Sequence, residues 1–141
     1  MKLSARTRYA IRVLSELTTA AAPLSIGDLA EKTGISTRAV EQICARLRYD
    51  GISTGIVGPS GGIRLEVPLG DISLGRLIDL FEDGVAFAVC CGDKANDCPH
   101  QNLCENRAVW RELSAKIQAE LDDIPLDSLL LRQGIVRLKQ P

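Results

Sequence analysis

Hydrophobic residues recur at helical spacing along most of the chain, and short β-rich runs interrupt that pattern in one place. The first predicted helix spans residues 3–22, and Ser4 can cap its start. Its apolar positions fall at i, i+3, i+4 and i+7, which predicts one buried stripe of Ala10, Val13, Leu14 and Leu17. Arg6, Arg8 and Arg12 lie off the stripe, where they either face solvent or contact phosphate; we count Arg8 among the residues expected to contact DNA.

Two further helices follow, separated by a glycine turn. Ser25 and Asp28 have capping-box spacing and start a short helix that Gly34 ends. Ser36 caps the next helix, Thr37 to Tyr49, whose buried face contains Val40, Ile43, Cys44 and Leu47. A short helix, a turn and a longer helix form the helix-turn-helix outline, and we expect Cys44 to belong to the core.

A β-hairpin is predicted directly after the second of these helices. The runs 52–57 and 63–65 are β-rich, and Gly58-Pro59-Ser60-Gly61-Gly62 lies between them. A hairpin in this position is the wing of a winged helix. The predicted fold is therefore mainly α-helical with a small β-hairpin wing.

Two more helices flank a polar loop in the second half. Ser73 caps a helix to Glu82 that Gly84 closes, and a long helix is expected from Glu105 to Asp123. Its stripe is close to a heptad seam and consists of Trp110, Leu113, Ile117 and Leu121. Such a stripe can cover its own domain or pair with a second copy; in so small a chain we favour a homodimer.

The chain is thus expected to divide into four parts. These are a winged helix-turn-helix domain (1–83), a cysteine loop (84–104), a dimerisation helix with its C-terminal segment (105–130), and a tail (131–141).

Composition and charge narrow the function. Aromatic residues make up only 4% of the 141 residues, which argues against base stacking on single strands. Residues 1–64 carry nine basic against five acidic side chains, and residues 65–141 carry eight against thirteen. This split favours nucleic acid as a partner of the N-terminal half. The chain shows neither an export signal nor an apolar run of membrane-spanning length, so we expect a cytoplasmic protein with no membrane partner.

Four of the five cysteines lie in one polar loop, at Cys90, Cys91, Cys98 and Cys104. Thiols in the cytosol stay reduced, so a cluster of them indicates a metal or redox site. An iron–sulfur cluster, [2Fe–2S] or [4Fe–4S], suits these thiolates, and zinc ranks lower because the loop lacks tight Cys-x2–4-Cys pairs. A thiol–disulfide switch ranks third.

The fourth ligand of such a cluster is open. We expect only one of Cys90 and Cys91 to coordinate, on the assumption that adjacent side chains diverge. The candidates are the other vicinal cysteine, an exogenous molecule, His100, Asp93, Asp97 or Glu105.

The second helix of the helix-turn-helix presents a polar face that can read base edges in a major groove. An ordinary solvated face is the alternative, but the basic bias and the helix-turn-helix outline favour DNA. The exposed positions are Thr37, Arg38, Glu41, Gln42, Arg46 and Arg48.

These features together resemble the winged-helix iron–sulfur regulators of bacteria, the group that includes IscR, NsrR, RirA and CymR. The likeness runs from about Met1 to Leu130. It is carried by Arg8-Tyr9-Ala10, Gly34-Ile35-Ser36, Glu41-Gln42, Arg46-Leu47-Arg48, the wing tip, three spaced cysteines and Val109-Trp110.

The resemblance implies a homodimer that binds double-stranded promoter DNA and holds a cluster in the cysteine loop. It places Ser36, Thr37, Arg38, Glu41 and Gln42 at the major groove. The wing, with Ser60 and Gly61 at its tip, would reach the minor groove. Arg64 is the candidate for an arginine contact there.

The chain departs from the family at three positions. An arginine that precedes the wing's Gly-Pro in some members is Val57 here. The histidine that serves some members as fourth ligand is Arg107, and an acidic ligand that others take from the first helix falls on Arg8.

A cluster-controlled DNA-binding regulator is therefore the favoured function, with a zinc- or thiol-based regulator or a cluster-carrying electron-transfer component as alternatives. The sequence shows neither paired carboxylates nor a nucleophile–base set nor a nucleotide loop, so we expect no enzymatic activity.

Overall fold

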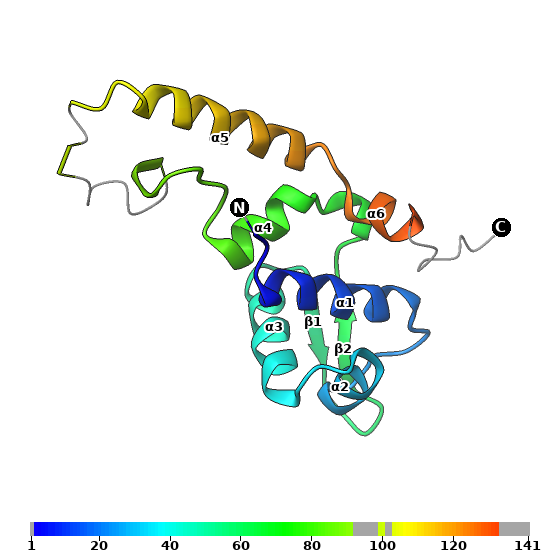
Figure 1. Ribbon diagram of the computed structural model, residues 1–141. Helices are drawn as coiled ribbons and strands as arrows, with labels where there is room; N and C mark the ends of the chain where they lie inside the picture. Colours follow the sequence, from blue (N-terminus) through cyan, green and yellow to red (C-terminus); the bar gives the residue numbers. More distant parts are fainter. Residues whose placement is uncertain (1, 92–98, 101–102, 133–141) are drawn as a thin grey trace.

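The computed structural model describes residues 2–91, 99–100 and 103–132, which form six α-helices and one two-stranded antiparallel sheet. The N-terminal half contains α1 (Ala5–Thr19), α2 (Ile26–Thr33), α3 (Thr37–Tyr49), β1 (Ser53–Ile56) and β2 (Gly62–Leu65). The second half contains η1 (Leu69–Asp71), α4 (Leu74–Glu82), η2 (Val89–Cys91), α5 (Arg107–Asp122) and α6 (Leu126–Arg132). The predicted winged-helix fold class is confirmed (Figure 1).

Local capping explains where the first three helices begin and end. The Ser4 hydroxyl accepts a hydrogen bond from the Thr7 amide at the start of α1. Ser25 and Asp28 form the full capping box at α2, and Gly34 adopts a left-handed conformation (φ 68°) where α2 ends. These devices were expected from the sequence and are present.

The wing is tied to the segment that precedes α2. β1 pairs with β2 from Ser53↔Leu65 to Ile56↔Gly62, and Leu24 exchanges two backbone hydrogen bonds with Ile63. A Cβ at Gly62 would lie 2.6 Å from the carbonyl carbon of Leu24, so only glycine allows this approach. Gly62 is the first residue of β2, although the sequence suggested that it belongs to the turn.

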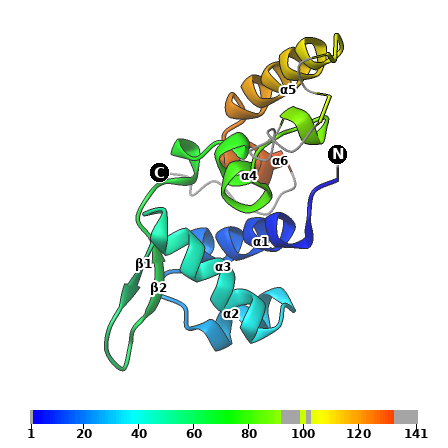
Figure 2. The ribbon, with the colours of Figure 1, turned by 90° about the vertical axis from the view of Figure 1, so that its left-hand side faces the viewer.

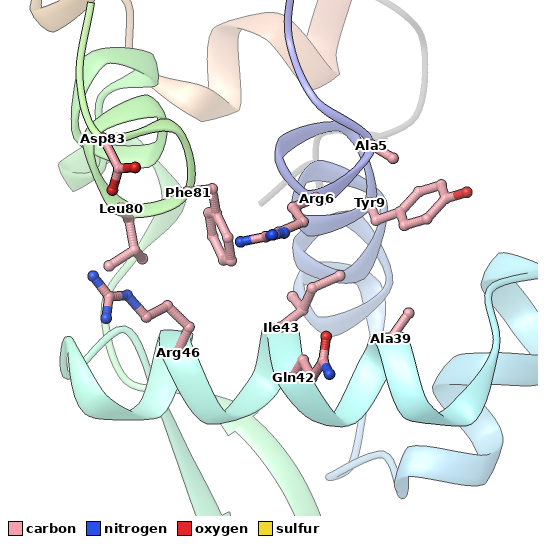
Figure 3. A pocket seen from close by; sticks show the side chains of 10 residues that line it. All are labelled: Ala5, Arg6, Tyr9, Ala39, Gln42, Ile43, Arg46, Leu80, Phe81 and Asp83. Atoms are coloured by element: carbon pink, nitrogen blue, oxygen red, sulfur yellow. The ribbon is translucent and has the colours of Figure 1, made fainter. Parts of the chain in front are cut away.

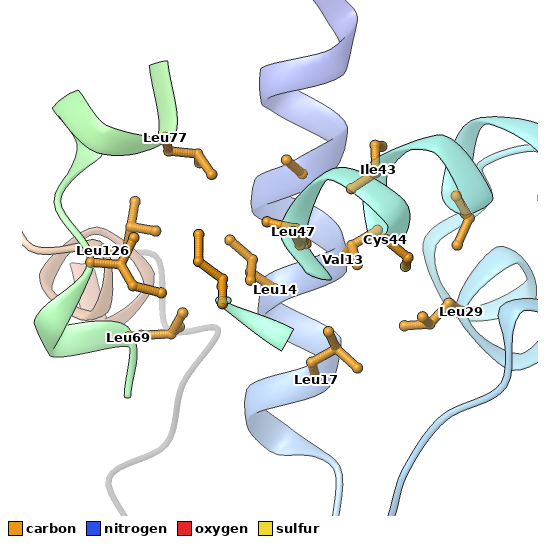
Figure 4. Close-up of a cluster of buried hydrophobic side chains, with 14 of the residues drawn as sticks. Val13, Leu14, Leu17, Leu29, Ile43, Cys44, Leu47, Leu69, Leu77 and Leu126 are labelled. Carbon is orange, nitrogen blue, oxygen red and sulfur yellow. The ribbon is translucent and has the colours of Figure 1, made fainter. Parts of the chain in front are cut away.

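One hydrophobic core joins both halves of the chain (Figure 4). The predicted stripe of α1 is buried at its centre, between α2 and α3 on one side and η1, α4 and α6 on the other. Cys44 is among the buried residues of α3, as expected. Leu126 and Leu130 of α6 are both 2% exposed, so the C-terminal segment contributes to the core of the winged-helix domain.

Helix α5 lies alongside α4 and is fixed to it by specific contacts. A Cβ at Gly75 would lie 1.9 Å from the Asp122 carboxylate and 2.9 Å from the Asp122 backbone nitrogen, so glycine permits the close crossing. The Phe87 amide donates to the Ser114 hydroxyl at 3.1 Å, and the Leu74 amide donates to the Ile124 carbonyl at 2.8 Å.

Several predicted boundaries were wrong in detail. The first helix starts at Ala5 and ends at Thr19, because the Ala20 backbone leaves the helical region and becomes extended. Asp83, not Gly84, is the C-cap of α4, with a left-handed φ of 59°. Helix α5 begins at Arg107 instead of Glu105, and α6 was not predicted as a separate helix. The residues from 133 on lie outside the described chain.

Candidate nucleic-acid interface and cysteine site

The polar face of α3 is exposed along its whole length. All seven residues expected to contact DNA there are open to solvent: Ser36, Thr37, Arg38, Glu41, Gln42, Arg46 and Arg48. Figures 1 and 2 show α3 and the hairpin at one end of the molecule and α5 at the other. A bound duplex could therefore reach α3 and the wing without touching α5.

The exposed side chains of α3 differ in their local roles. The Ser36 hydroxyl accepts a hydrogen bond from the Ala39 amide at 3.3 Å, so it caps the helix as well as facing solvent. Arg48 lies against the wing, because one of its guanidinium nitrogens is 3.8 Å from the place of a Cβ on Gly55. Thr37, Arg38 and Glu41 stand at the first turns of the helix.

Tyr49 is a surface residue that the sequence analysis did not select. Its side chain is 86% exposed, and the Arg46 guanidinium carbon lies 5.9 Å from its ring centroid. The two residues are three positions apart on the polar face of α3, a spacing at which helical neighbours meet. The signal available in the sequence was this spacing, together with the position of Tyr49 outside the apolar stripe of the helix.

The wing carries less free charge than expected. Arg64 forms an ion pair with Glu66 at 3.0 Å, so its guanidinium is already partly neutralised. At the tip, the Gly61 amide closes a turn on the Gly58 carbonyl at 2.9 Å, and Ser60 is exposed. Val57 is 99% exposed at the position where some related proteins have arginine.

A cavity of about 370 Å³ lies where α1, α3 and α4 meet (Figure 3). Arg6 and Arg46 supply its positive charge, and Asp83 supplies a carboxylate. Figure 3 shows Arg6 directed toward the ring of Phe81. Arg8, which the sequence assigned to DNA contact, is exposed on α1 and donates from Nε to the Ser4 carbonyl at 3.4 Å.

The cysteines are only partly brought together in the described residues. Cys90 and Cys91 are half-buried with their sulfur atoms 3.9 Å apart, whereas Cys104 is exposed. The assumption that the two adjacent side chains diverge was therefore wrong. Cys98, Asp93 and Asp97 lie outside the described residues, and within the described ones no three His, Cys, Asp or Glu side chains gather as a metal site would require.

The surroundings of the cysteines separate two kinds of thiol. Burial raises the pKa of the Cys44 thiol to about 11, which suits an inert core residue. Desolvation and the neighbouring Cys90 also raise the pKa of Cys91, but the charges of Arg107 and Arg111 oppose this rise. Arg107 Nε is buried and has no hydrogen-bond partner among the described residues.

The donor set fits an iron–sulfur cluster in chemistry. Thiolates are the ligands that such clusters require, and the cationic groups beside Cys91 favour negative charge.

The predicted dimerisation stripe of α5 is neither fully buried nor fully free. Leu113, Ile117 and Leu121 are half-buried, and Trp110 is 39% exposed. Val109 and Leu103 add further exposed apolar surface at the same end of the helix. The contacts of α5 with α4 and η2 therefore leave part of the stripe uncovered.

Helix α4 connects α1 and α3 with the cysteine segment. At its first turn, the Arg76 guanidinium binds Asp50 at the end of α3, with a closest distance of 2.9 Å. At its last residue, the Glu82 carboxylate accepts from the Ser4 amide at 2.7 Å and from the Thr7 hydroxyl. This carboxylate therefore sits at the positive N-terminal end of α1.

A helix-turn-helix followed by a hairpin and a long helix defines a winged-helix DNA-binding protein. The chain belongs to the Rrf2 family, described as iron-dependent transcriptional regulators, which it matches over residues 3–132. The resemblance noted in the sequence is thereby confirmed, and the protein is a transcriptional regulator.

Named relatives and solved structures agree with this assignment. The chain is 33% identical to the HTH-type transcriptional regulator IscR of Vibrio atlanticus, over 98% of this chain and 80% of that protein. It superposes on IscR of T. potens with a TM-score of 0.71 at 24% identity, covering 100% of this chain and 94% of the other. It superposes on the oxidised form of CymR from Staphylococcus aureus with a TM-score of 0.64 at 26% identity, covering 92% of this chain and 95% of the other.

The relatives are named regulators, which agrees with the expectation of no enzymatic activity. Within the described part of the chain, none of the helices combines the length and the apolar character that a bilayer crossing demands.

The Glu82 contacts predict a pH-dependent link between α4 and α1. Burial opposes ionisation, but the hydrogen bonds from Thr7 and Ser4 outweigh it and hold the pKa of Glu82 below its ordinary value of 4.5. Because the folded pKa is depressed, the stabilisation is present above the unfolded pKa and lost as the pH falls through the folded pKa.

We expect Glu82→Gln to lower the free energy of unfolding at pH 7 by about 1 kcal/mol, after allowance for solvent screening. In urea titrations the gap to the wild type should begin to narrow as the pH falls below about 4.5 and should close once the pH is below the depressed folded pKa. The control is Glu31→Gln, at an exposed position of α2. A gap that stays constant with pH would contradict an ionised Glu82 as the source.

Proposed function

We propose that this regulator is a homodimer whose binding to promoter DNA is controlled by an iron–sulfur cluster in the Cys90–Cys104 loop. The observation that carries the proposal is the position of α4, which contacts α1 and α3 on one side and leads to the cysteine segment on the other. In this proposal residues 1–83 bind DNA, residues 84–104 hold the cluster, and residues 105–130 dimerise and complete the core.

The first turns of α3 are proposed to enter the major groove. Their side chains offer hydroxyl, guanidinium, carboxylate and amide groups that match base edges. The residues are Ser36, Thr37, Arg38, Glu41 and Gln42. Arg8, Arg46 and Arg48 are proposed to contact phosphates, while Ser60, Gly61 and Arg64 follow the minor groove.

Arg38 provides the sharpest test of this interface, because it is exposed on α3 and lies outside the cavity and the ion pairs described above. If it makes a bidentate base contact, Arg38→Ala should weaken operator binding by about 1–3 kcal/mol and relax specificity at one position. If it contacts only phosphate, all sequences should weaken alike and the salt dependence should decrease. The measurement is a fluorescence anisotropy titration of operator and scrambled DNA at several salt concentrations.

Lys116→Ala is the matched control, because it removes the same charge from α5, at the far end of the molecule. Unchanged binding by Arg38→Ala, or an equal loss in the control, would show that this face of α3 does not read DNA.

The half-covered stripe of α5 supports the dimer. Its uncovered apolar surface includes Trp110 and continues to Val109, and apolar surface of this kind is removed from water when two helices pair. We propose that Trp110, Leu113, Ile117 and Leu121 meet the same residues of a second copy. The two recognition helices would then address half-sites about one duplex turn apart, roughly 34–36 Å.

Leu113→Lys should convert the dimer into a monomer at micromolar concentration, because it places a charge in the apolar seam. Ala115→Lys, on an exposed part of the same helix, is the matched control and should stay dimeric. Analytical ultracentrifugation gives the mass, and circular dichroism checks that both variants fold. A wild-type chain that is already monomeric at this concentration would refute the dimer.

The cysteine loop is proposed to act by tying two helices together. Cys90 and Cys91 follow α4, and Cys104 precedes α5, so shared coordination would fix the distance between these points. When bound, the cluster supplies a centre that responds to redox state or to iron supply. Changes in the α4–α5 arrangement would reach α3 and α1 through Arg76 and Glu82.

A regulator of the same fold that senses through its thiols is the second candidate. It is favoured by the neighbouring sulfur atoms of Cys90 and Cys91 and by the likeness to the oxidised form of Staphylococcus aureus CymR. Zinc is a third candidate for the same ligands.

We expect anaerobic reconstitution with iron and sulfide to give visible absorption in the wild type and in Cys44→Ala. The absorption should be lost in Cys98→Ala and Cys104→Ala, because each removes a ligand. Operator titrations with and without the cluster should then give different affinities. Equal affinities would leave the cysteines without a regulatory role, and a colourless protein with one zinc per chain would establish the zinc site instead.

A further inference from the structure

We propose that the cavity between α1, α3 and α4 is an effector site for a small organic carboxylate with an apolar body, and that its occupation weakens operator binding. The site is separate from the cysteine segment, because none of its lining residues comes from η2 or α5. Carboxylate binding is inferred from the cavity itself. The effect on the operator rests on the proposed function.

The cavity has the size of a small-molecule site. Its volume of about 370 Å³ falls within the roughly 300–1,000 Å³ usual for ligand pockets. The share of liquid volume that one water occupies is about 30 Å³, so the space admits a molecule of on the order of ten non-hydrogen atoms. The apolar part of its wall consists of Ala5, Tyr9, Ala39, Ile43, Leu80 and Phe81.

Two guanidinium groups give the cavity a preference for an anion. Figure 3 shows Arg6 reaching it from α1 and Arg46 reaching it from α3. In the part of the chain that the structure describes, no ion pair neutralises either arginine. Asp83 is the one acidic residue among the described residues that line the cavity, so the wall keeps a net positive charge. A planar guanidinium matches a carboxylate with two parallel hydrogen bonds.

The apolar body of the ligand is inferred from α4. Figure 3 shows Leu80 and Phe81 pointing from α4 toward α3, and both side chains are partly buried against the core. The Glu82 carboxylate, which follows Phe81 in the chain, accepts its hydrogen bonds from Ser4 and Thr7 instead. A ligand could therefore place its carboxylate at the arginines and remove its hydrocarbon part from water against Leu80 and Phe81.

Two residues of the cavity are also proposed DNA contacts, and this overlap couples the two sites. Gln42 and Arg46 line the cavity and are exposed on the polar face of α3. The Arg46 guanidinium cannot give the same hydrogen bonds to a bound carboxylate and to a DNA phosphate. The carboxylate should therefore lower operator affinity, and operator DNA should lower carboxylate affinity by the same factor.

The first test titrates the purified wild type, without DNA, by isothermal titration calorimetry. The probes are phenylacetate and hexanoate, and the controls are their neutral amides, which have similar shapes and no charge. We expect each carboxylate to saturate one site per chain, and each amide to bind at least about tenfold more weakly because it loses the charge-assisted hydrogen bonds. Equal binding of acid and amide, or no binding of either carboxylate at millimolar concentration, would overturn the inference.

Arg6→Met locates the site that the carboxylates occupy. It removes the charge and keeps an unbranched side chain, so both carboxylates should bind at least about tenfold more weakly. Arg12→Met is the matched control, because Arg12 is exposed on the same helix and does not line the cavity. Wild-type carboxylate affinity in a folded Arg6→Met variant would overturn the assignment to this cavity. If that variant does not fold, the comparison of carboxylates with amides on the wild type decides.

Operator titrations separate this inference from the proposed function. They use the state, with or without cluster, that binds the operator more tightly. At constant ionic strength, saturating phenylacetate should raise the apparent dissociation constant for the operator at least about fivefold, and phenylacetamide should not. Unchanged operator affinity with bound carboxylate would overturn the effector role.

A DNA phosphate is the alternative occupant of the cavity. Weaker operator binding by Arg6→Met, in a protein that binds neither carboxylate, would identify that occupant and overturn the inference while leaving the proposed function intact. A wild type that binds no operator would refute the proposed function and the effector role with it. Carboxylate binding would then still stand or fall by calorimetry.

Discussion

The attachment of α4 at both of its ends is the constraint on which the arrangement of this protein depends. Arg76 holds the first turn of α4 to Asp50 at the end of α3, and Glu82 holds its last residue to the N-terminus of α1. The ion pair at Asp50 is partly exposed and contributes little energy on its own. The ion pair matters for geometry. Together with the Glu82 contact it fixes both ends of α4, and two fixed points define the direction of this short helix relative to the helix-turn-helix.

The C-terminal helices extend this constraint. Gly75 allows α5 to cross α4 closely, and backbone hydrogen bonds join Leu74 to Ile124 and Leu126 to Ile72. Leu126 and Leu130 then enter the core around α1. The segment after α5 therefore returns to the core around α1. A displacement of α5 would therefore strain both its close crossing with α4 and the core around α1.

The elements that local chemistry determines could be predicted from the sequence. The caps at Ser4, Ser25 and Ser36 and the apolar stripe of α1 were expected and are observed. The left-handed Asp83 was missed, because a non-glycine residue takes that conformation only where its surroundings favour it. Helix α6 was missed because its leucines follow Pro125 closely and give too short a pattern to separate from the end of α5.

The candidate site was predictable in its residue types but not in its geometry. Spacing alone indicated that one of Cys90 and Cys91 would turn away, whereas the η2 turn holds both sulfurs on one side. Likewise, Arg107 looked like the loss of a ligand, since it stands where some relatives have histidine. In the structure its Nε is buried without a hydrogen-bond partner among the described residues, and its charge opposes the rise in the pKa of Cys91.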